Sequence, residues 1–321
     1  MRILALHGSK ICGYRSGKQE DFPPLPSAVT VGSYDGLHVG HRKIIDAMIV
    51  RAGEKSLRSV VVTFEPHPRL VLDRTSSCPV SLLTTLEEKI SHLESMGVDL
   101  LLVVRFDREF ADRSSESFIR EVLVGLLCSA HVVVGYDHGF GHDRSGSGVT
   151  LQALGAECGF DVDVVEEVLV GDEPVSSTRI RKLLLEGGVR EANACLGAPY
   201  LVSGTVVDGQ KRGRRIGFPT VNLRPAEPCK LIPAHGVYVA RTSIDGKAWP
   251  AMMNIGVRPT VSDDETVTVE AHILGFTGDL YGREMMFSML EYVREERRFG
   301  SIGELQEQLE RDKKMVELYR E

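Results

Sequence analysis

The sequence predicts an α/β domain built on a doubly wound parallel sheet, followed by an antiparallel β-barrel with a terminal helix. Up to about residue 190, short β-branched runs alternate with helical patterns. The runs are apolar almost throughout, which is typical of parallel strands that are covered on both faces. After Pro199, strand-like runs follow one another with Gly, Pro or Asp between them. This change predicts a second domain of a different class.

The first half alternates strands and helices. Its expected strands are Ala28–Val31, Ser59–Phe64, Asp99–Val104, His131–Gly135 and Asp161–Val168. Its expected helices are His41–Ala52, Leu86–Met96, Phe118–Cys128 and Val149–Cys158. Thr85 and Glu88 have the spacing of a capping box, which starts the second of these helices. We expect two short helices, Ser177–Glu186 and Val189–Leu196, to close this domain.

The second half is mostly strands. The expected ones are Tyr200–Asp208, Gly236–Ile244, Trp249–Ile255, Val267–Leu274 and Glu284–Val293, within a barrel of about six. Asp245-Gly246 is a good hairpin turn between two of them. Ser301 and Glu304 form a capping box for a last helix. One face of that helix is expected to pack on the barrel through Ile302, Leu305, Leu309, Val316 and Tyr319. The expected domains are residues 1–190 and 197–321.

Composition narrows the class of protein. The net charge of −7 argues against a protein that binds nucleic acid electrostatically. The six cysteines are scattered without a Cys-x-x-Cys pair, which favours reduced thiols over a zinc cluster or a disulfide framework. They are Cys12, Cys78, Cys128, Cys158, Cys195 and Cys229. Neither a signal peptide nor an apolar run of about 20 residues is present, so we expect a soluble cytoplasmic protein with no membrane segment. The oligomeric state stays open.

The loop Gly32–His41 follows the first of the expected strands and leads into a helix. His38 and His41 are three residues apart, which puts both imidazoles on one side of the helix start. That end is electropositive, so the two rings could stabilise a phosphate during attack at phosphorus. Local capping or packing is the alternative for both histidines. A zinc site is less favoured, because no third ligand of matching spacing appears.

A second phosphate-binding candidate in this domain is the segment Val175–Arg181. Ser177 or Thr178 could cap a helix there, which would leave its free backbone amides facing a phosphate. Arg181 would lie one turn further along. The alternative is an ordinary helix cap followed by surface arginines.

Asp208–Asn222 combines basic residues with glycines. Lys211, Arg212, Arg214 and Arg215 could form a solvated basic turn, but the glycines favour a phosphate loop. Thr220 and Asn222 are two residues apart, so they lie on one side of an extended strand. Their neutral oxygens suit Mg²⁺ that is coordinated mostly by water and phosphates.

Glu270 lies in a strand of alternating pattern. The alternation puts Thr268, Glu270 and His272 on one face. The opposite face carries Val267, Val269, Ala271 and Ile273. From the alternation alone, the face of Glu270 is most simply explained as solvent-exposed.

The first half resembles the adenylyltransferase half of bacterial bifunctional riboflavin kinase/FAD synthetases, which are Rossmann-like HxGH nucleotidylyltransferases. The resemblance lies in the Gly32–His41 loop, Ser176–Arg181, Val62–Arg69 and Gly135–Gly146. It implies catalysis by His38, His41 and Arg181. The implied ATP-binding residues are Gly32, Tyr34, Asp35, Gly36, His38, His41, Ser177, Thr178 and Arg181. The implied FMN-binding residues are Pro66, His67, Pro68, Asp137 and Phe140.

The second half resembles riboflavin kinases over nearly its whole length. The matching stretches are Gly213–Asn222, Gly236–Tyr238, Asn254–Thr260, Val269–His272, Leu280–Gly282 and Arg294–Phe299. The resemblance implies that Glu270 is the base for riboflavin, and that Thr220 and Asn222 hold Mg²⁺ with ATP. The implied ATP-binding residues are Arg214, Gly217, Thr220, Asn222, Ile273 and Tyr281. Arg294, Arg297 and Phe299 would bind the flavin.

The expected protein is therefore a bifunctional enzyme that makes FMN from riboflavin and ATP, and then FAD from FMN and ATP. Its expected partners are small molecules, with no nucleic acid and no membrane. One alternative is a riboflavin kinase with a degenerate first domain. Others are a first domain that transfers nucleotide to a nicotinate or pantetheine phosphate, and a flavin-sensing regulator built on an inactive kinase.

Overall fold

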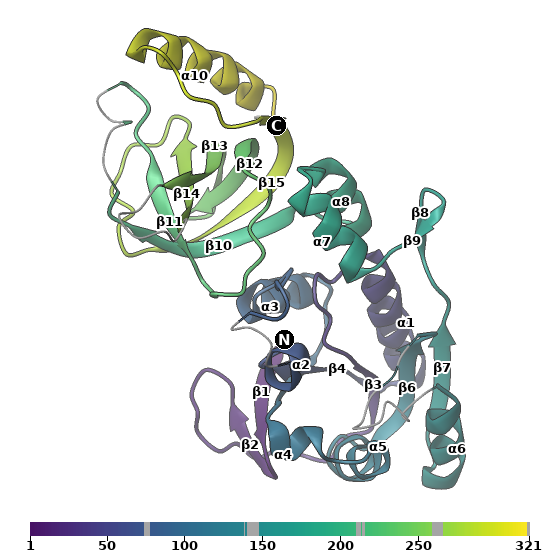
Figure 1. Cartoon of the computed structure of the whole chain (residues 1–321). Coiled ribbons are helices and arrows are strands. Elements are labelled where there is room, and N and C mark those ends of the chain that lie inside the picture. Colours follow the sequence, from purple (N-terminus) through teal and green to yellow (C-terminus); the bar gives the residue numbers. More distant parts are fainter. Residues whose placement is uncertain are drawn as a thin grey trace. The chain divides into compact units, whose positions relative to one another are not determined.

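The structure is a computed structural model, which describes residues 1–73, 78–137, 139, 148–209, 213, 216–258 and 266–319. The chain forms two compact units (Figure 1). The first comprises Met1–Val80 and Leu86–Val175, and the second comprises Ser81–Thr85 and Ser176–Glu321. The expected functional boundaries at residues 190 and 197 stay a prediction, because compactness does not by itself locate an activity.

The first unit contains a seven-stranded sheet in the order β2-β1-β5-β4-β3-β6-β7. Its strands are β1 Arg2–His7, β2 Lys10–Gly13, β3 Ser27–Val31, β4 Arg58–Glu65, β5 Leu100–Arg105, β6 Ser129–Gly135 and β7 Asp161–Val165. Every neighbouring pair is parallel except β1–β2, which confirms the predicted parallel sheet. The sequence did not predict the hairpin β1–β2. A short antiparallel hairpin β8–β9, Leu169–Val170 with Glu173–Pro174, stands outside this sheet.

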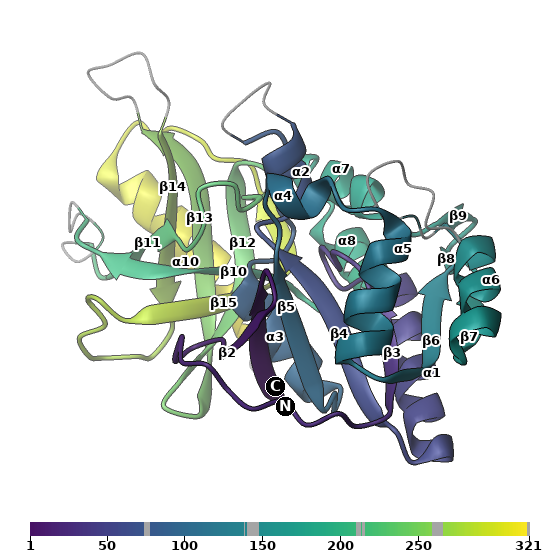
Figure 2. The ribbon, with the colours of Figure 1, turned by 90° about the horizontal axis from the view of Figure 1, so that it is seen from below.

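Helices cover both faces of this sheet (Figure 2). Successive residues of β4 face opposite clusters, since Val60 and Val62 pack in one and Val61 in the other. One face is covered by α1 Val39–Lys55 and α3 Leu86–Ser95, and the other by α5 Ser115–Phe118, the π-helical η1 Ile119–Leu126 and α6 Gly148–Cys158. The short helices are α2 Pro68–Leu72 and α4 Arg108–Ala111. Within the described residues, no helix is both long and apolar enough to cross a membrane.

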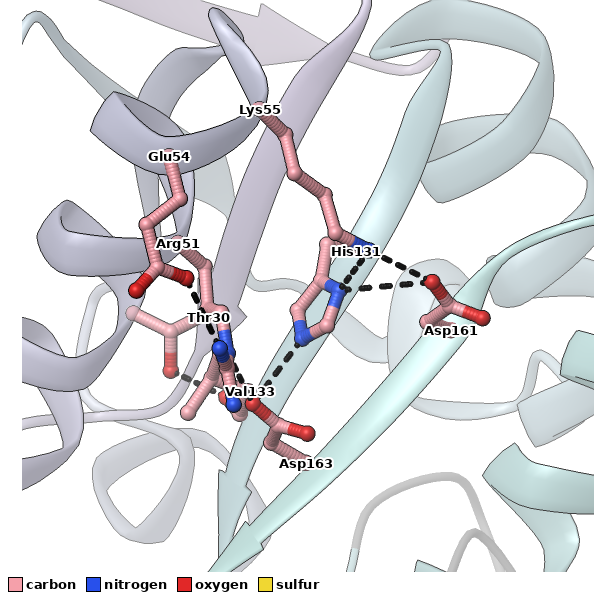
Figure 3. Close-up of polar contacts among 8 residues, drawn as sticks. All are labelled: Thr30, Arg51, Glu54, Lys55, His131, Val133, Asp161 and Asp163. Carbon is pink, nitrogen blue, oxygen red and sulfur yellow. Dashed lines mark hydrogen bonds and ion pairs between the residues drawn. The ribbon is translucent and has the colours of Figure 1, made fainter.

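A charged cluster fixes the end of α1 to the amino-terminal ends of β6 and β7 (Figure 3). Arg51 Nε donates to Asp163 Oδ2 over 2.7 Å, and Lys55 Nζ donates to Asp161 Oδ2 over 2.6 Å. Lys55 Nζ also donates to Nδ1 of the buried His131 over 3.2 Å. Because Nδ1 accepts, the proton of a neutral His131 is on Nε2, which lies 3.0 Å from Asp163 Oδ2.

The second unit contains a closed antiparallel barrel in the order β10-β11-β14-β13-β12-β15, which confirms the predicted six strands. The strands are β10 Tyr200–Val207, β11 Val221–Pro225, β12 Gly236–Ile244, β13 Lys247–Arg258, β14 Thr266–Ile273 and β15 Glu284–Arg294. Asp245 and Gly246 have φ of 51° and 79°, as the predicted two-residue hairpin turn requires. Two helices precede the barrel, α7 Ser177–Leu185 and α8 Val189–Leu196.

The terminal helix α10, Ile302–Glu317, packs on the barrel (Figure 1). Ser301 Oγ caps it by accepting from Glu304 N over 3.2 Å. Val316 is buried against barrel side chains. The prediction that Ile302 faces the barrel is wrong, since it is 67% exposed. The buried face is centred on Gln308, Asp312 and Val316, and helical geometry places Ile302 at the edge of that face.

The interpretation of all six cysteines as reduced thiols is also wrong. Cys78 and Cys229 are disulfide-bonded, whereas Cys12, Cys128, Cys158 and Cys195 are free. Within the second unit, the segment around Cys229 takes part in a long-range backbone pairing. Leu82 N donates to Cys229 O over 2.7 Å, and Leu82 forms a parallel bridge with Lys230. Spacing along the sequence does not reveal such a pairing.

Candidate functional site

The turn Gly32–His41 leaves the carboxyl end of β3, which lies between β4 and β6. From β3 the chain proceeds to β4 and β5 on one side, and later to β6 and β7 on the other. The space between β3 and β6 is therefore the point where the strand order reverses. In open parallel sheets, ligands bind outside the carboxyl ends of the strands at such a point.

The backbone of this turn adopts unusual conformations. Tyr34, Gly36 and Leu37 have φ of 47°, 91° and 43°. Non-glycine residues in this region carry strain that surrounding contacts must offset, and such strain concentrates at functional sites. A Cβ at Gly32 would lie only 3.0 Å from the Tyr34 ring, so only glycine fits without movement. The turn brings His38 to the N-cap of α1.

His38 and His41 form a stacked pair, with ring centroids 3.6 Å apart and an interplanar angle of 18°. This confirms that the two imidazoles share one side of the helix start. His38 Nδ1 accepts a hydrogen bond from His41 N over 3.3 Å, so a neutral His38 carries its proton on Nε2. Within the described residues, the buried Nδ1 of His41 has no hydrogen-bond partner.

Both histidines are neutral at physiological pH. Burial lowers the pKa of His38 to about 4, although Asp137 and Asp35 act in the opposite direction. Burial lowers the pKa of His41 well below its usual value, and electrostatic interactions with His38 and Lys89 act in the same direction. Each ring can therefore donate one N–H to a phosphate oxygen without itself carrying a positive charge.

Tyr34 packs against His41, and its predicted contact with ATP stays a prediction. Its ring meets His41 edge to face, with centroids 5.2 Å apart, and the residue is 3% exposed. Its hydroxyl lies 2.5 Å from Thr30 Oγ1, which donates to Val133 O over 2.7 Å. Burial raises the pKa of Tyr34. Asp35 is likewise buried. The structure thus places Tyr34 as a support for the histidines.

The residues predicted to bind FMN lie at the same edge of the sheet as far as the structure describes them. Pro66, His67 and Pro68 follow β4, and Asp137 follows β6. His67 caps α2, since its Nδ1 accepts from Arg69 N over 3.2 Å. Asp137 is near enough to His38 to affect its pKa. Phe140 lies outside the described residues.

The remaining residues predicted for this site belong to the second unit. Ser176, not Ser177 or Thr178, caps α7, because Ser176 Oγ accepts from Arg179 N over 3.2 Å. The local sequence offers three consecutive hydroxyls, which made the choice ambiguous. Arg181 Nε donates to Ser81 O over 2.7 Å. That Ser177, Thr178 and Arg181 join the histidines at one ATP site stays a prediction.

In the barrel, the structure brings together three predicted residues. Glu270 of β14 pairs with Asn222 of β11, and Thr220 Oγ1 donates to Glu270 Oε2 over 3.3 Å. Val269 and Ala271 are buried, whereas Glu270 between them is half-buried, as the predicted alternation requires. The ends of the strand depart from the alternation, since Val267 is 43% exposed and His272 is buried. On the other side, Glu270 pairs with Asn254 of β13.

The segment that carries Thr220 is held by neighbours that sequence reasoning did not assign. His272 Nδ1 donates to Pro219 O over 2.7 Å, and its ring meets Phe218 edge to face. Burial lowers the pKa of His272. The Asn222 side chain packs closely against the backbone at Gly209, since a Cβ added at Gly209 would overlap with the Asn222 amide. These contacts fix Thr220 and Asn222 beside Glu270.

The other predicted ATP-binding residues of the barrel lie in the turn before Thr220, at the end of β14 and in the connection that follows β14. Gly217 has φ of 86° in the turn before Thr220. Ile273 is buried near the end of β14. Tyr281 is 44% exposed in the connection between β14 and β15. Arg214 lies outside the described residues.

The three residues predicted to bind the kinase flavin form one cluster. The Arg294 and Arg297 guanidinium groups lie 5.9 and 4.8 Å from the Phe299 ring centroid. Arg294 Nε and Nη2 donate to the carboxylate of Asp312 over 2.7–3.1 Å. Arg297 donates to Gln308, whose Nε2 donates to Asp312 over 2.7 Å.

Asp312 and Gln308 were missed by the sequence analysis. Their position in α10 could have indicated a buried role. Gln308, Asp312 and Val316 follow one another at intervals of four residues, so they share one helical face. Polar residues in line with a buried apolar one indicate partners beneath the helix.

Comparisons with known proteins identify the family. Residues 23–179 match the family model described as FAD synthetase, and residues 196–319 match the one described as riboflavin kinase. A bifunctional riboflavin kinase/FMN adenylyltransferase from Listeria monocytogenes is 37% identical over 91% of this chain and 92% of its own length. One from Escherichia coli K12 is 38% identical over 90% of this chain and 91% of its own length. The chain belongs to the bifunctional riboflavin kinase/FMN adenylyltransferase family.

A solved structure shows the same fold over nearly the whole of this family member. A crystal structure titled as a macrolide-efflux protein from Streptococcus pneumoniae is 31% identical, with a TM-score of 0.83. It covers 92% of this chain, and 96% of its own length is matched. The parallel-sheet unit and the six-stranded barrel therefore have a counterpart of the same fold among solved structures.

Proposed function

We propose that this chain phosphorylates riboflavin to FMN with one ATP and adenylylates FMN to FAD with another, releasing pyrophosphate. Family membership supports both reactions, and the site geometry supports each one separately. The observation that carries the proposal is the contact between Thr220 and Glu270, beside Asn222 in the barrel. That arrangement puts a carboxylate next to neutral oxygen ligands. A flavin-sensing regulator would need neither this contact nor the stacked histidines, and a riboflavin kinase with a degenerate first domain would not need the stacked histidines.

In the first unit, the FMN phosphate would attack the α-phosphorus of ATP, and pyrophosphate would leave. The nucleophile is already an anion, so no strong base is needed. His38 and His41 would donate hydrogen bonds to the α-phosphate as its charge grows, which stabilises the transition state. Their neutral state suits this role, because each can donate one N–H from a buried position. Arg181 would add a positive charge.

In the second unit, Glu270 would accept the proton of the riboflavin 5′-hydroxyl while that oxygen attacks the γ-phosphorus of ATP. ADP would leave, and FMN would form. A general base must lie within hydrogen-bond reach of the proton that it takes. Glu270 is half-buried and holds the Thr220 hydroxyl, so its carboxylate is oriented before substrate binds. Arg294, Arg297 and Phe299 would hold the flavin.

Magnesium fits the barrel site. Thr220 Oγ1, Asn222 Oδ1 and the Glu270 carboxylate are oxygen ligands, which Mg²⁺ prefers together with water and phosphate. The close packing of Gly209 on the Asn222 amide leaves that side chain little freedom to turn away. Thr220 and Asn222 would hold the ion, which neutralises charge on the ATP phosphates.

We further propose that the activities divide between residues 190 and 197. The proposed partners are small molecules, with no nucleic acid and no membrane, and the proposed location is the cytoplasm. The net charge of −7 supports small-molecule partners over nucleic acid. The division is tested with a fragment from Gly197 to Glu321. It should phosphorylate riboflavin and make no FAD. A folded, ATP-binding fragment without kinase activity would refute this division.

The two activities are tested separately by supplying different substrates to the full chain. Riboflavin with MgATP should yield FMN and then FAD, while FMN with MgATP should yield FAD and pyrophosphate in equal amounts. Chromatography resolves the flavins. Formation of FMN with no FAD from either substrate would restrict the function to the kinase.

A further inference from the structure

Lys89 is a buried cation that the proposed reactions do not yet use. It lies on α3, in line with the apolar Leu86, Ile90 and Leu93, and it is 4% exposed. Burying an ammonium group is costly unless charges and hydrogen bonds compensate for the lost water. A lysine in this position therefore needs specific partners.

Those partners belong to the candidate adenylyl-transfer site. Lys89 Nζ donates to Ser33 O over 2.7 Å and to Thr63 Oγ1 over 3.0 Å. Thr63 Oγ1 in turn donates to Ser33 O over 3.3 Å. This closed set of hydrogen bonds joins α3 and the carboxyl end of β4 to the turn that carries the histidines.

The charge of Lys89 reaches the same groups. Burial lowers the pKa of Lys89, although Asp35 of the turn and Glu65 at the end of β4 act in the opposite direction by favouring its charged form. Lys89 in turn lowers the pKa of His41. Lys89 thus interacts with the turn through hydrogen bonds and with His41 through its charge.

We propose that Lys89 is a positioning residue for adenylyl transfer, which fixes the Gly32–His41 turn through its hydrogen bond to Ser33. This inference rests on the proposed transferase function of the first unit. Ser33 directly precedes the strained Tyr34, so a support at Ser33 holds the segment that aims both imidazoles. The buried charge would also favour the anionic reactants of the proposed reaction.

The matched variants are Lys89→Met, which keeps length but removes charge, and Lys89→Arg, which keeps charge. Lys10→Met is the control, because Lys10 is an exposed lysine on β2. Misplacing reacting groups by about 1 Å can cost on the order of 10²-fold in rate. We expect K89M to lower kcat for FAD formation by about that factor, with the KM for ATP within about threefold. K89R should recover part of the loss, and K10M should match the wild type.

The kinase of the same chain is the folding control, because FMN formation depends on the second unit. Thr63→Val removes only the hydroxyl and should lower kcat in the same direction by a smaller factor, so the test does not depend on K89M alone. An unchanged kcat in K89M overturns the proposal. So does an effect confined to the KM for ATP, which would indicate direct ATP binding, or equal loss of both activities, which would indicate a folding role.

A second readout does not require activity. NMR titration of the histidine Cε1 protons in the full chain should show His41 protonating at higher pH in K89M than in the wild type or K10M. An unmoved His41 titration would refute the electrostatic role. If the wild type makes no FAD from FMN but this shift appears, the proposed reaction fails while the link between Lys89 and His41 stands.

Discussion

Thr220 and Glu270 come from segments 50 residues apart in the sequence, and the Thr220 hydroxyl donates to the Glu270 carboxylate over 3.3 Å. The strand register also sets Glu270 beside Asn222 on one side and Asn254 on the other. A carboxylate that merely faced solvent would not need such neighbours. This relationship favours a catalytic role for Glu270.

Replacing Glu270 with Gln should abolish most kinase activity. The amide keeps the shape and can still accept from Thr220, but it cannot take the riboflavin proton. Positioned bases contribute about 10²–10⁴-fold, so FMN formation should fall by that order. The measurement is initial FMN formation from riboflavin, with Glu284→Gln on the exposed start of β15 as control. FAD formation from supplied FMN should persist, and a kinase rate near normal would leave Glu270 as a surface residue.

His38→Ala and His41→Ala should lower FAD formation through kcat. The histidines are proposed to act on charge that develops at the α-phosphate, and loss of one such donor costs on the order of 10²–10³-fold. Single-turnover rates with supplied FMN give the catalytic effect, and calorimetry gives the affinity for ATP. Exposed His7 on β1 provides the control substitution, His7→Ala. Lost ATP binding with normal residual turnover would make the histidines anchors rather than catalysts.

The stability of the first unit should fall on acidification because of His38. Its pKa is about 4 when folded and about 6.5 when exposed, so the unfolded state binds more protons between those values. Stability is therefore lost as pH falls from about 6.5. From pH 7 to pH 5 the contribution of His38 should be about 2 kcal/mol.

Urea unfolding at both pH values measures this effect as a difference between the wild type and His38→Gln. Trp249, the only tryptophan of the chain, lies in the second unit. Its fluorescence therefore follows the unfolding of the second unit, which can then be told apart from the unfolding of the first unit. Equal acid sensitivity of the wild type and H38Q would contradict the buried neutral state of His38.

Asp312→Asn should destabilise the second unit. The Asp312 side chain is 2% exposed and pairs with Arg294, which is 18% exposed. Removing one charge of a buried pair leaves the other uncompensated and costs about 3–5 kcal/mol. The free energy of unfolding reported by Trp249 fluorescence gives the value.

The control is Asp245→Asn, which removes one partner of the exposed pair with Arg283 while Asn still fits the turn at Asp245. Exposed pairs are worth at most about 1 kcal/mol, so D245N should change little. Similar losses in both variants would show that Asp312 is not a special anchor of α10.

Much of this architecture could be predicted from sequence, because periodicity reports which side of an element is buried. The apolar runs of β3, β4 and β5 indicated a parallel sheet, and the Asp245-Gly246 turn indicated a hairpin. Individual contacts across the chain could not be predicted in this way. The disulfide-bonded state of Cys78 and Cys229 is one example, because composition and spacing do not encode it.

The candidate sites show the same limit. The spacing of His38 and His41 indicated their shared side, and the alternation around Glu270 indicated its face. Lys89 and Asp312 were missed, because each looks like an ordinary charged residue of a helix until its apolar neighbours are counted. Their partners, Ser33 and Arg294, lie far away in sequence.

The most direct test of two separate sites on one chain is a complementation experiment with riboflavin and MgATP. The wild type should form FMN and then FAD, E270Q should form neither at an appreciable rate, and H38A/H41A should accumulate FMN. An equimolar mixture of E270Q and H38A/H41A should restore FAD formation, because FMN released by one variant is the substrate of the other. In one contrary outcome, E270Q alone still converts supplied FMN, yet the mixture forms FMN and no FAD. That result would show that free FMN does not link the two steps. If E270Q makes no FAD from supplied FMN, the account of two independent sites is contradicted.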